Sequence, residues 1–292
     1  MGHFGDFGLF CHRESNGLSG VTVAKTLSIV SWLASIIVSV YCGSRGSPHD
    51  TEQSQNPWAL NYAHSSSFTM NSTLGRHDAN ETPRSSLLNW QVLFIVQLFS
   101  RDSDRVQQAV HVCIYFIANN VLHAIFLLLF VHSFFWLSEA VLVLNFINLS
   151  VLHFRHKALP LQIQLSAVSF PLSWTFFALY WNGFMMVPNQ SLVAARVVGC
   201  VFIWALLGYG ILSLGAFKDP AMSLCLSFIS IAVGVGQIER LASTPELVAP
   251  FVIGMVLGFA TLLQLHMCWL RSTFGRKSAK SENLAEEKSV SA

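Results

Sequence analysis

The segment Phe134–His156, FFWLSEAVLVLNFINLSVLHFRH, decides the fold class of this chain. It contains about 20 consecutive, mainly apolar residues, which is the length that crosses the hydrocarbon core of a bilayer as an α-helix. It also carries Glu139, Asn145 and Asn148, whose side chains are costly to place in hydrocarbon. The segment therefore predicts a membrane-spanning helix whose polar side chains face other helices or water.

The composition of the whole chain supports an integral membrane protein. Of its 292 residues, 53% are hydrophobic and only 11% are charged, whereas soluble domains carry about 25% charged residues. The net charge of +2 is small and scattered, so the basic stripe that nucleic-acid binding requires is absent. We expect the lipid bilayer to be the main partner of the chain, and we expect no nucleic-acid partner.

Further apolar segments predict an all-α fold, a polytopic bundle of transmembrane helices. Eight segments have this character, and seven spans remain if the short second segment does not cross. The predicted spans are Val21–Tyr41, Ser86–Phe99, Ala109–Val131, Phe134–Phe154, Leu161–Trp181, Ser191–Leu214, Pro220–Gln237 and Leu247–Leu270.

The topology follows from the distribution of lysine and arginine near the ends of the spans. Most of them lie on the side of the two termini, which predicts a cytosolic N-terminus (residues 1–20), a transmembrane domain (21–270) and a disordered cytosolic tail (271–292). A loop rich in Ser, Asn, His and Pro (43–85) is expected to be mobile and lumenal. Glycosylation sequons that fall on the lumenal side predict a glycoprotein of the endoplasmic reticulum; they begin at Asn71, Asn80 and Asn189.

Polar residues of several spans are expected to converge in the lumenal half of the bundle. Glu139 and Arg196 lie at similar predicted depth, while Asn119 and His123 share one helical face. These four residues are the catalytic candidates. Two interpretations stay open: Glu139 and Arg196 form an ion pair, or Glu139 is free to donate a proton.

Other polar and aromatic residues have both structural and functional explanations. Asn145 is expected either to hold helices together or to bind a substrate. The aromatic residues either form an interfacial belt or wall a pocket that stabilises a cation. The predicted substrate-binding residues are Trp136, Asn145, Trp174, Phe177, Trp181 and Trp204.

Two further features have simple interpretations. Asp219 precedes Pro220, which predicts a helix N-cap followed by proline at the first helical position. The six cysteines show no metal-ligand spacing, so we expect no metal site and no cofactor.

Several motifs also carry a resemblance. FWLSEAVLVLNFINLSVLHFRH, PLSWTFFALYWNG, AARVVGCVFIW, GAFKDP and GVGQ occur in an order that resembles a fungal family of multi-pass membrane proteins of unknown function, over about 119–237. Membrane-bound terpene cyclases of fungal meroterpenoid pathways are associated with proteins of this type. The resemblance implies an enzyme of secondary metabolism that cyclises a farnesyl or epoxyfarnesyl chain on an aromatic core.

The functional hypothesis is therefore a membrane-bound terpene cyclase of the isomerase or lyase type. Glu139 would protonate an olefin or epoxide of a prenylated substrate, aromatic rings would shield the carbocation, and His123 or a water held by an asparagine would take the final proton. A small-molecule transporter and a non-catalytic membrane scaffold are the alternatives.

Overall fold

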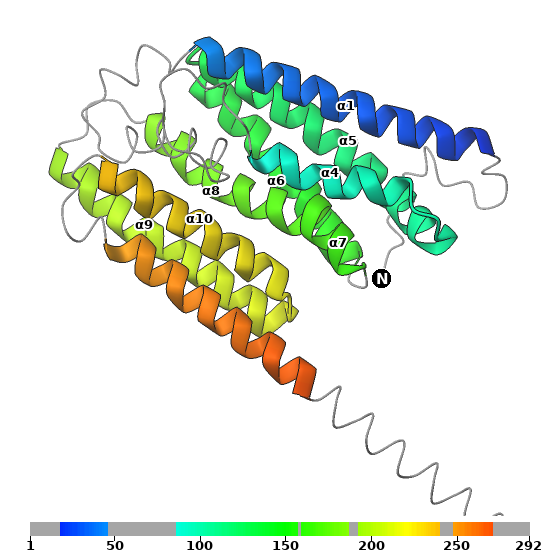
Figure 1. Ribbon diagram of the computed structural model, residues 1–292. Helices are drawn as coiled ribbons and strands as arrows, with labels where there is room; N and C mark the ends of the chain where they lie inside the picture. The colour runs from blue at the N-terminus through cyan, green and yellow to red at the C-terminus, as the bar shows by residue number, and fades with distance from the viewer. Residues whose placement is uncertain (1–17, 46–85, 157–158, 187–191, 240–247, 271–292) are drawn as a thin grey trace, which may run out of the picture. The chain divides into compact units, whose positions relative to one another are not determined.

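The computed structural model describes residues 18–45, 86–156, 159–186, 192–239 and 248–270, except for some side chains near the helix ends. Every regular element within these ranges is a helix (Figure 1). The elements are α1 (Leu18–Arg45), α4 (Ser86–Leu98), α5 (Ser103–Val131), α6 (Phe135–Arg155), α7 (Leu161–Ile163), the π-helix η1 (Gln164–Ser169), α8 (Phe170–Met185), α9 (Leu192–Leu212), the π-helix η2 (Ser213–Phe217), α10 (Pro220–Glu239) and a final helix, Val248–Leu270.

Each of the eight predicted spans coincides with helical structure, and the predicted all-α fold is confirmed for the described residues. Other predictions lie outside the described residues. These are the cytosolic N-terminus, the lumenal loop, the C-terminal tail and the three sequons at Asn71, Asn80 and Asn189.

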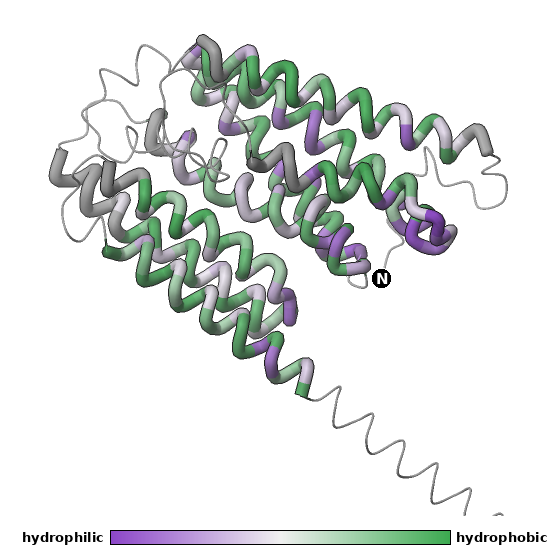
Figure 2. Tube along the Cα trace, viewed as in Figure 1, coloured by the Kyte–Doolittle hydropathy of each residue, from purple (hydrophilic) through white to green (hydrophobic). Residues whose placement is uncertain are grey.

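The helices have the length and composition of membrane spans. Five helical segments of the described chain are long and apolar enough to cross a bilayer, namely Gly20–Cys42, Ser103–Val131, Phe135–Arg155, Leu161–Gly183 and Val248–Leu270. Figure 2 shows that mainly hydrophobic residues cover these helices. This pattern is that of a multi-pass membrane protein. The 13 residues described for α4 rise about 20 Å, less than the hydrocarbon core of about 30 Å, so a crossing of the bilayer by this segment stays a prediction.

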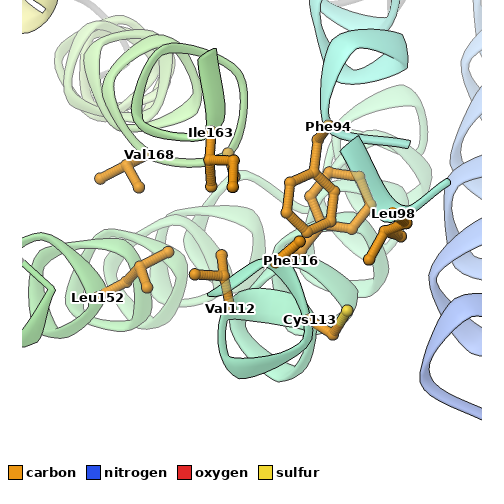
Figure 3. Packing of buried hydrophobic residues seen from close by; sticks show 10 residues of the cluster. Phe94, Leu98, Val112, Cys113, Phe116, Leu152, Ile163 and Val168 are labelled. Atoms are coloured by element: carbon orange, nitrogen blue, oxygen red, sulfur yellow. The ribbon is translucent and has the colours of Figure 1, made fainter. Parts of the chain in front are cut away.

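The chain divides into two compact units, and each is described by itself. The first contains α1, α4, α5, α6, α7 and η1. Its apolar core joins α4, α5 and α6 to the α7–η1 segment, and the rings of Phe94 and Phe116 contact each other within it at an angle of 34° (Figure 3). The two ring centroids are 4.3 Å apart, a contact that contributes about 0.5–1.5 kcal/mol beyond the area it buries.

A row of serines forms the buried face of α1. Ser28, Ser31, Ser35 and Ser39 are all buried, although most of the large apolar residues of α1 are exposed. Two of the hydroxyls donate to carbonyls of α1 itself, Ser31 to Ser28 and Ser39 to Ser35. Small side chains let membrane helices approach closely, so this serine row explains how α1 packs against the rest of its unit.

The helix from Leu161 changes its hydrogen-bond pattern before a proline. In η1 the N–H of Phe170 donates to the carbonyl of Leu165, five residues earlier. Pro171 follows directly and has no N–H to continue an α-helical ladder. The π-helical turn therefore accommodates a proline that would otherwise break this helix.

In the second unit, Asp219 caps α10. Its carboxylate accepts hydrogen bonds from the N–H groups of Ala221 and Met222, at 3.0 and 3.3 Å, and Pro220 occupies the first helical position. The predicted N-cap is confirmed. The preceding residue, Lys218, adopts the left-handed conformation (φ 53°) that ends η2.

Glycines of the final helix allow close contact with α10. The Ser227 hydroxyl donates to the carbonyl of Gly254 at 2.6 Å. A Cβ atom on Gly254 would lie 2.6 Å from Ile231 Cγ1 and 3.2 Å from the Ser227 carbonyl oxygen, and one on Gly258 would lie 3.1 Å from Ser227 Oγ. Gly254 and Gly258 thus form a G-x-x-x-G contact, which is common between membrane helices.

Replacing Gly254 with leucine is expected to separate these two helices. The change should reduce the free energy of unfolding by about 1–3 kcal/mol or more, because the new side chain would overlap a packed backbone. Thermal unfolding of the detergent-solubilised full chain measures the effect. Gly215→Leu is the matched control, since a Cβ on Gly215 meets nothing within 4 Å. Equal stability of the Gly254 variant and the wild type would contradict the close contact.

Candidate functional site

A tight turn forces α5 and α6 into an antiparallel pair. Only three residues separate Val131 from Phe135, and Ser133 at their centre has a positive φ of 61°. The N–H of Ser133 donates to the carbonyl of Phe130, and that of Phe134 donates to Leu129, both at 3.0 Å. The helices α5 and α6 therefore face each other across one interface.

A polar seam, formed by Asn119, His123 and Asn145, lies within this interface. Asn145 belongs to the buried face of α6, together with Ser138, Leu142, Leu149 and Leu152. Its amide nitrogen donates to the side-chain oxygen of Asn119 at 3.0 Å. This bond links two buried amides that would otherwise be expensive in lipid.

The same bond sets the depth of the candidate acid and base. His123 is buried and lies four residues beyond Asn119 on α5, while Glu139 is half-buried and lies six residues before Asn145 on α6. Because the helices are antiparallel, both residues are displaced toward the same end of the pair. Their depths differ by about two residues, or about 3 Å along the axis.

The predicted partner of Glu139 cannot be placed in the same way. Arg196 belongs to α9, but its side chain lies outside the described residues. The choice between an ion pair with Arg196 and a free carboxyl group therefore stays a prediction. Glu139 does have interactions with its surroundings.

Asn120 is a buried amide that the sequence analysis did not select. Its side chain is 0% exposed, and neither its nitrogen nor its oxygen has a hydrogen-bond partner among the described residues. Leaving a buried polar group unsatisfied costs about 1–3 kcal/mol. The sequence could have pointed to Asn120, because it follows Asn119 directly in an apolar segment. It does not show which of the two asparagines faces α6.

The predicted aromatic residues fall into two groups. Trp174 and Trp181 of α8 are buried, at 3% and 5% exposure, and Phe177 is half-buried. Trp136 on α6 is 74% exposed and Trp204 on α9 is 46% exposed. The rings of α8 and the polar seam belong to different units, so each is described separately.

A second polar cluster lies at the opposite end of the α5–α6 pair. Arg155 donates from Nη1 to the Tyr115 hydroxyl at 3.0 Å, and the Tyr115 and His156 ring centroids are 6.3 Å apart in an edge-to-face arrangement. Asn148 donates to the Tyr115 carbonyl at 3.1 Å. Burial, together with the positive charges of His111 and Arg155, holds the pKa of His156 below its ordinary value of 6.5. We call His111, Tyr115, Arg155 and His156 the basic cluster.

Metal-ligating residues do not gather in the part of the chain that the structure describes. No group of three or more His, Cys, Asp or Glu side chains there is arranged to hold a metal ion. The cysteines Cys42, Cys113, Cys225 and Cys268 are free thiols. The predicted absence of a metal and a cofactor stays a prediction for the whole chain.

These observations define the class of the protein: a multi-pass helical membrane protein with a polar seam inside one helix pair. Residues 196–289 match the model of a family described as "Fungal protein of unknown function (DUF1774)". The match covers less than half of the chain, from α9 to the C-terminal segment, so the chain is similar to this family over that part. No curated protein and no solved structure matches the chain.

The family match agrees in part with the resemblance that the sequence motifs predicted. A fungal family of unknown function is supported over residues 196–289, which overlap only the later part of the predicted likeness. The association with terpene cyclases receives no support from it.

The Asn119–Asn145 bond can be tested by a double-mutant cycle. Asn119→Leu and Asn145→Leu should each cost about 1 kcal/mol, because each leaves the other amide buried without this partner. The double variant should cost less than the sum, since both amides are removed. Unfolding of the purified chain in mixed micelles measures the three values, with the exposed Val143→Leu on α6 as control. Strictly additive losses would show that the two side chains are not coupled.

The environment of His156 predicts a pH dependence of stability. Its lowered pKa means that the folded chain holds the neutral ring, so the unfolded chain binds more protons once the pH falls below about 6.5. The wild type should therefore lose thermal stability between pH 7 and pH 5.5, and His156→Gln should lose less. Measurements are made in neutral detergent, with His132→Gln in the α5–α6 turn as control. An identical pH profile for the wild type and His156→Gln would contradict the assignment.

Proposed function

We propose that the protein is a terpene cyclase of the endoplasmic reticulum membrane, with about eight spans and both termini in the cytosol. One observation carries the proposal: the Asn119–Asn145 bond sets the register of α5 and α6 so that His123 and Glu139 lie at nearly the same depth. An acid and a base at one level inside an apolar bundle are what a proton-initiated cyclisation requires.

The proposed substrate is a prenylated, farnesyl-type meroterpenoid intermediate. Such a molecule is a lipid and partitions into the bilayer, so its binding site belongs among the helices. Initiation requires a neutral carboxylic acid, and removal of a carboxyl group from water favours the neutral form. Glu139, which is half-buried in an apolar helix, is the candidate in the described residues.

The proposed reaction balances without an external reactant. Glu139 donates a proton to the epoxide oxygen or terminal olefin, the C–O or C=C π bond breaks, and the chain closes as new C–C bonds form. The final carbocation loses a proton from carbon to His123 Nε2 or Nδ1. Return of this proton from His123 to Glu139 completes the cycle, so the product is an isomer of the substrate.

The roles of the other predicted site residues stay predictions. Trp174, Phe177 and Trp181 are buried or half-buried in α8, and Arg196 and Trp204 belong to α9, so all five lie in the second unit, whereas His123 and Glu139 lie in the first. Trp136 is in the first unit and is 74% exposed. The proposal therefore rests on His123 and Glu139.

A non-catalytic membrane scaffold is the second candidate. The observation that favours it is that the asparagines of α6 bond to α5, Asn145 to the Asn119 side chain and Asn148 to the Tyr115 carbonyl. Such bonds are the usual means by which membrane helices associate. A small-molecule transporter is favoured only by the π-helical turn before Pro171, since interrupted helices are typical of transport paths.

A substrate panel tests the cyclase. Microsomes that contain the full chain are incubated with epoxyfarnesylated and farnesylated phenols, and products are analysed by mass spectrometry. We expect a new product with unchanged mass. No isomer from any substrate of the panel would remove the cyclase proposal and leave the scaffold.

Glu139→Gln tests the acid directly. The amide keeps the shape of the side chain but cannot donate the proton, so turnover should fall by about 100-fold or more, the range of general acid catalysis. The amount of folded protein is measured in parallel. The matched control is Asp104→Asn, which removes an exposed carboxylate in the first turn of α5. Undiminished turnover of Glu139→Gln would exclude Glu139 as the acid.

A further inference from the structure

The basic cluster lies where the membrane is expected to end. The 29 residues of α5 rise about 43 Å, which exceeds the hydrocarbon core by more than two helical turns. Its first residues, SDRVQQ, are mainly polar, and the apolar part begins at Ala109, two residues before His111. Figure 2 shows the hydropathy along the helices. On the antiparallel partner, α6, the apolar part ends at Phe154 and the helix ends at Arg155. His111, Arg155 and His156 therefore lie at one polar–apolar boundary.

The geometry brings the cluster together from two helices. His111 and Tyr115 are one turn apart on the same face of α5. Arg155 and His156 end α6 and contact Tyr115 through the 3.0 Å hydrogen bond and the ring contact. His111 and Arg155 are exposed, so a ligand can reach their side chains. Tyr115 and His156 are half-buried and pack against the helix pair.

Arg155 carries the permanent positive charge of the basic cluster. Its guanidinium is exposed, and the hydrogen bond from Nη1 to the Tyr115 hydroxyl at 3.0 Å orients it. A phosphate would accept charge-assisted hydrogen bonds from this guanidinium, and such bonds are shorter and stronger than bonds between neutral groups.

We propose that the basic cluster binds the phosphate of an anionic phospholipid headgroup, held between the ends of α5 and α6. Basic pockets between transmembrane helices at the membrane surface are suited to such headgroups. Arg155 would bind the phosphate oxygens, His111 would add a second donor, and the Tyr115 hydroxyl would fix the position of the guanidinium. This inference concerns the end of the helix pair opposite to Glu139 and does not depend on the proposed cyclase.

Binding of three small ligands to the detergent-solubilised full chain tests the proposal. Dioctanoyl phosphatidic acid supplies the phosphate on a lipid, inorganic phosphate supplies the anion alone, and dioctanoylglycerol supplies the lipid alone. We expect the phosphatidic acid to bind with a Kd at least about tenfold lower than either of the others, since both parts contribute. Equal affinity for inorganic phosphate would overturn a lipid headgroup as the ligand, and equal affinity for dioctanoylglycerol would overturn the phosphate site.

Variants locate the site. Arg155→Gln and His111→Gln should each raise the Kd for the phosphatidic acid, the arginine change by about fivefold or more, which corresponds to about 1 kcal/mol for one cationic residue at the surface. The exposed His111 remains available if Arg155→Gln does not fold. Arg105→Gln is the matched control, because Arg105 lies on the polar start of α5 and pairs with Asp102 at 3.1 Å. Unchanged affinity in the His111 variant, or in a folded Arg155 variant, would overturn the assignment.

Discussion

The hydrogen bond between Asn119 and Asn145 is the interaction on which the organisation of the first unit depends. In lipid, polar groups must find partners within the protein, and this bond satisfies one buried amide from each of two facing helices. It also permits only one register of α5 against α6. A shift by one turn would separate the amides and would break the contact of Asn148 with the Tyr115 carbonyl. The position of every other polar residue of the pair follows from that register.

The register of α5 against α6 thus places two clusters of polar residues at opposite ends of the helix pair. Toward the α5–α6 turn lie His123 and Glu139, and toward the free ends lie Tyr115, Arg155 and His156. Between them the buried face of α6 carries Leu142, Asn145 and Leu149. The proposed cyclisation and the proposed binding of a lipid headgroup therefore involve different residues of the α5–α6 pair.

The sequence predicted the helices well, because length and apolarity are local properties. The predicted span Phe134–Phe154 agrees with α6 to within one residue at each end. The Asp219 cap was predictable from the adjacent Asp219 and Pro220 alone. The serine row of α1 and the π-helical turn before Pro171 were not predicted. Both depend on how a helix meets its neighbours, and the neighbours of α1 lie far along the chain.

The candidate site was predictable only in part for the same reason. Asn119, His123 and Asn145 were identifiable as polar residues in apolar segments, and the structure places all three in buried positions. Their pairing was not predictable, because the rotation of one helix against another is set by all the side chains between them. Asn120 shows this limit: it follows Asn119 directly, yet it has no partner among the described residues while its neighbour bonds to Asn145.

The serine row of α1 has a consequence for the order of biosynthesis. During synthesis α1 emerges well before α5, so its future packing face meets lipid before it meets a protein partner. The hydroxyls of Ser31 and Ser39 bond to carbonyls of their own helix, which removes much of the cost of exposing them to hydrocarbon. These two serines therefore have hydrogen-bond partners before a later helix packs against them, whereas the Asn145 side chain bonds to Asn119 of another helix.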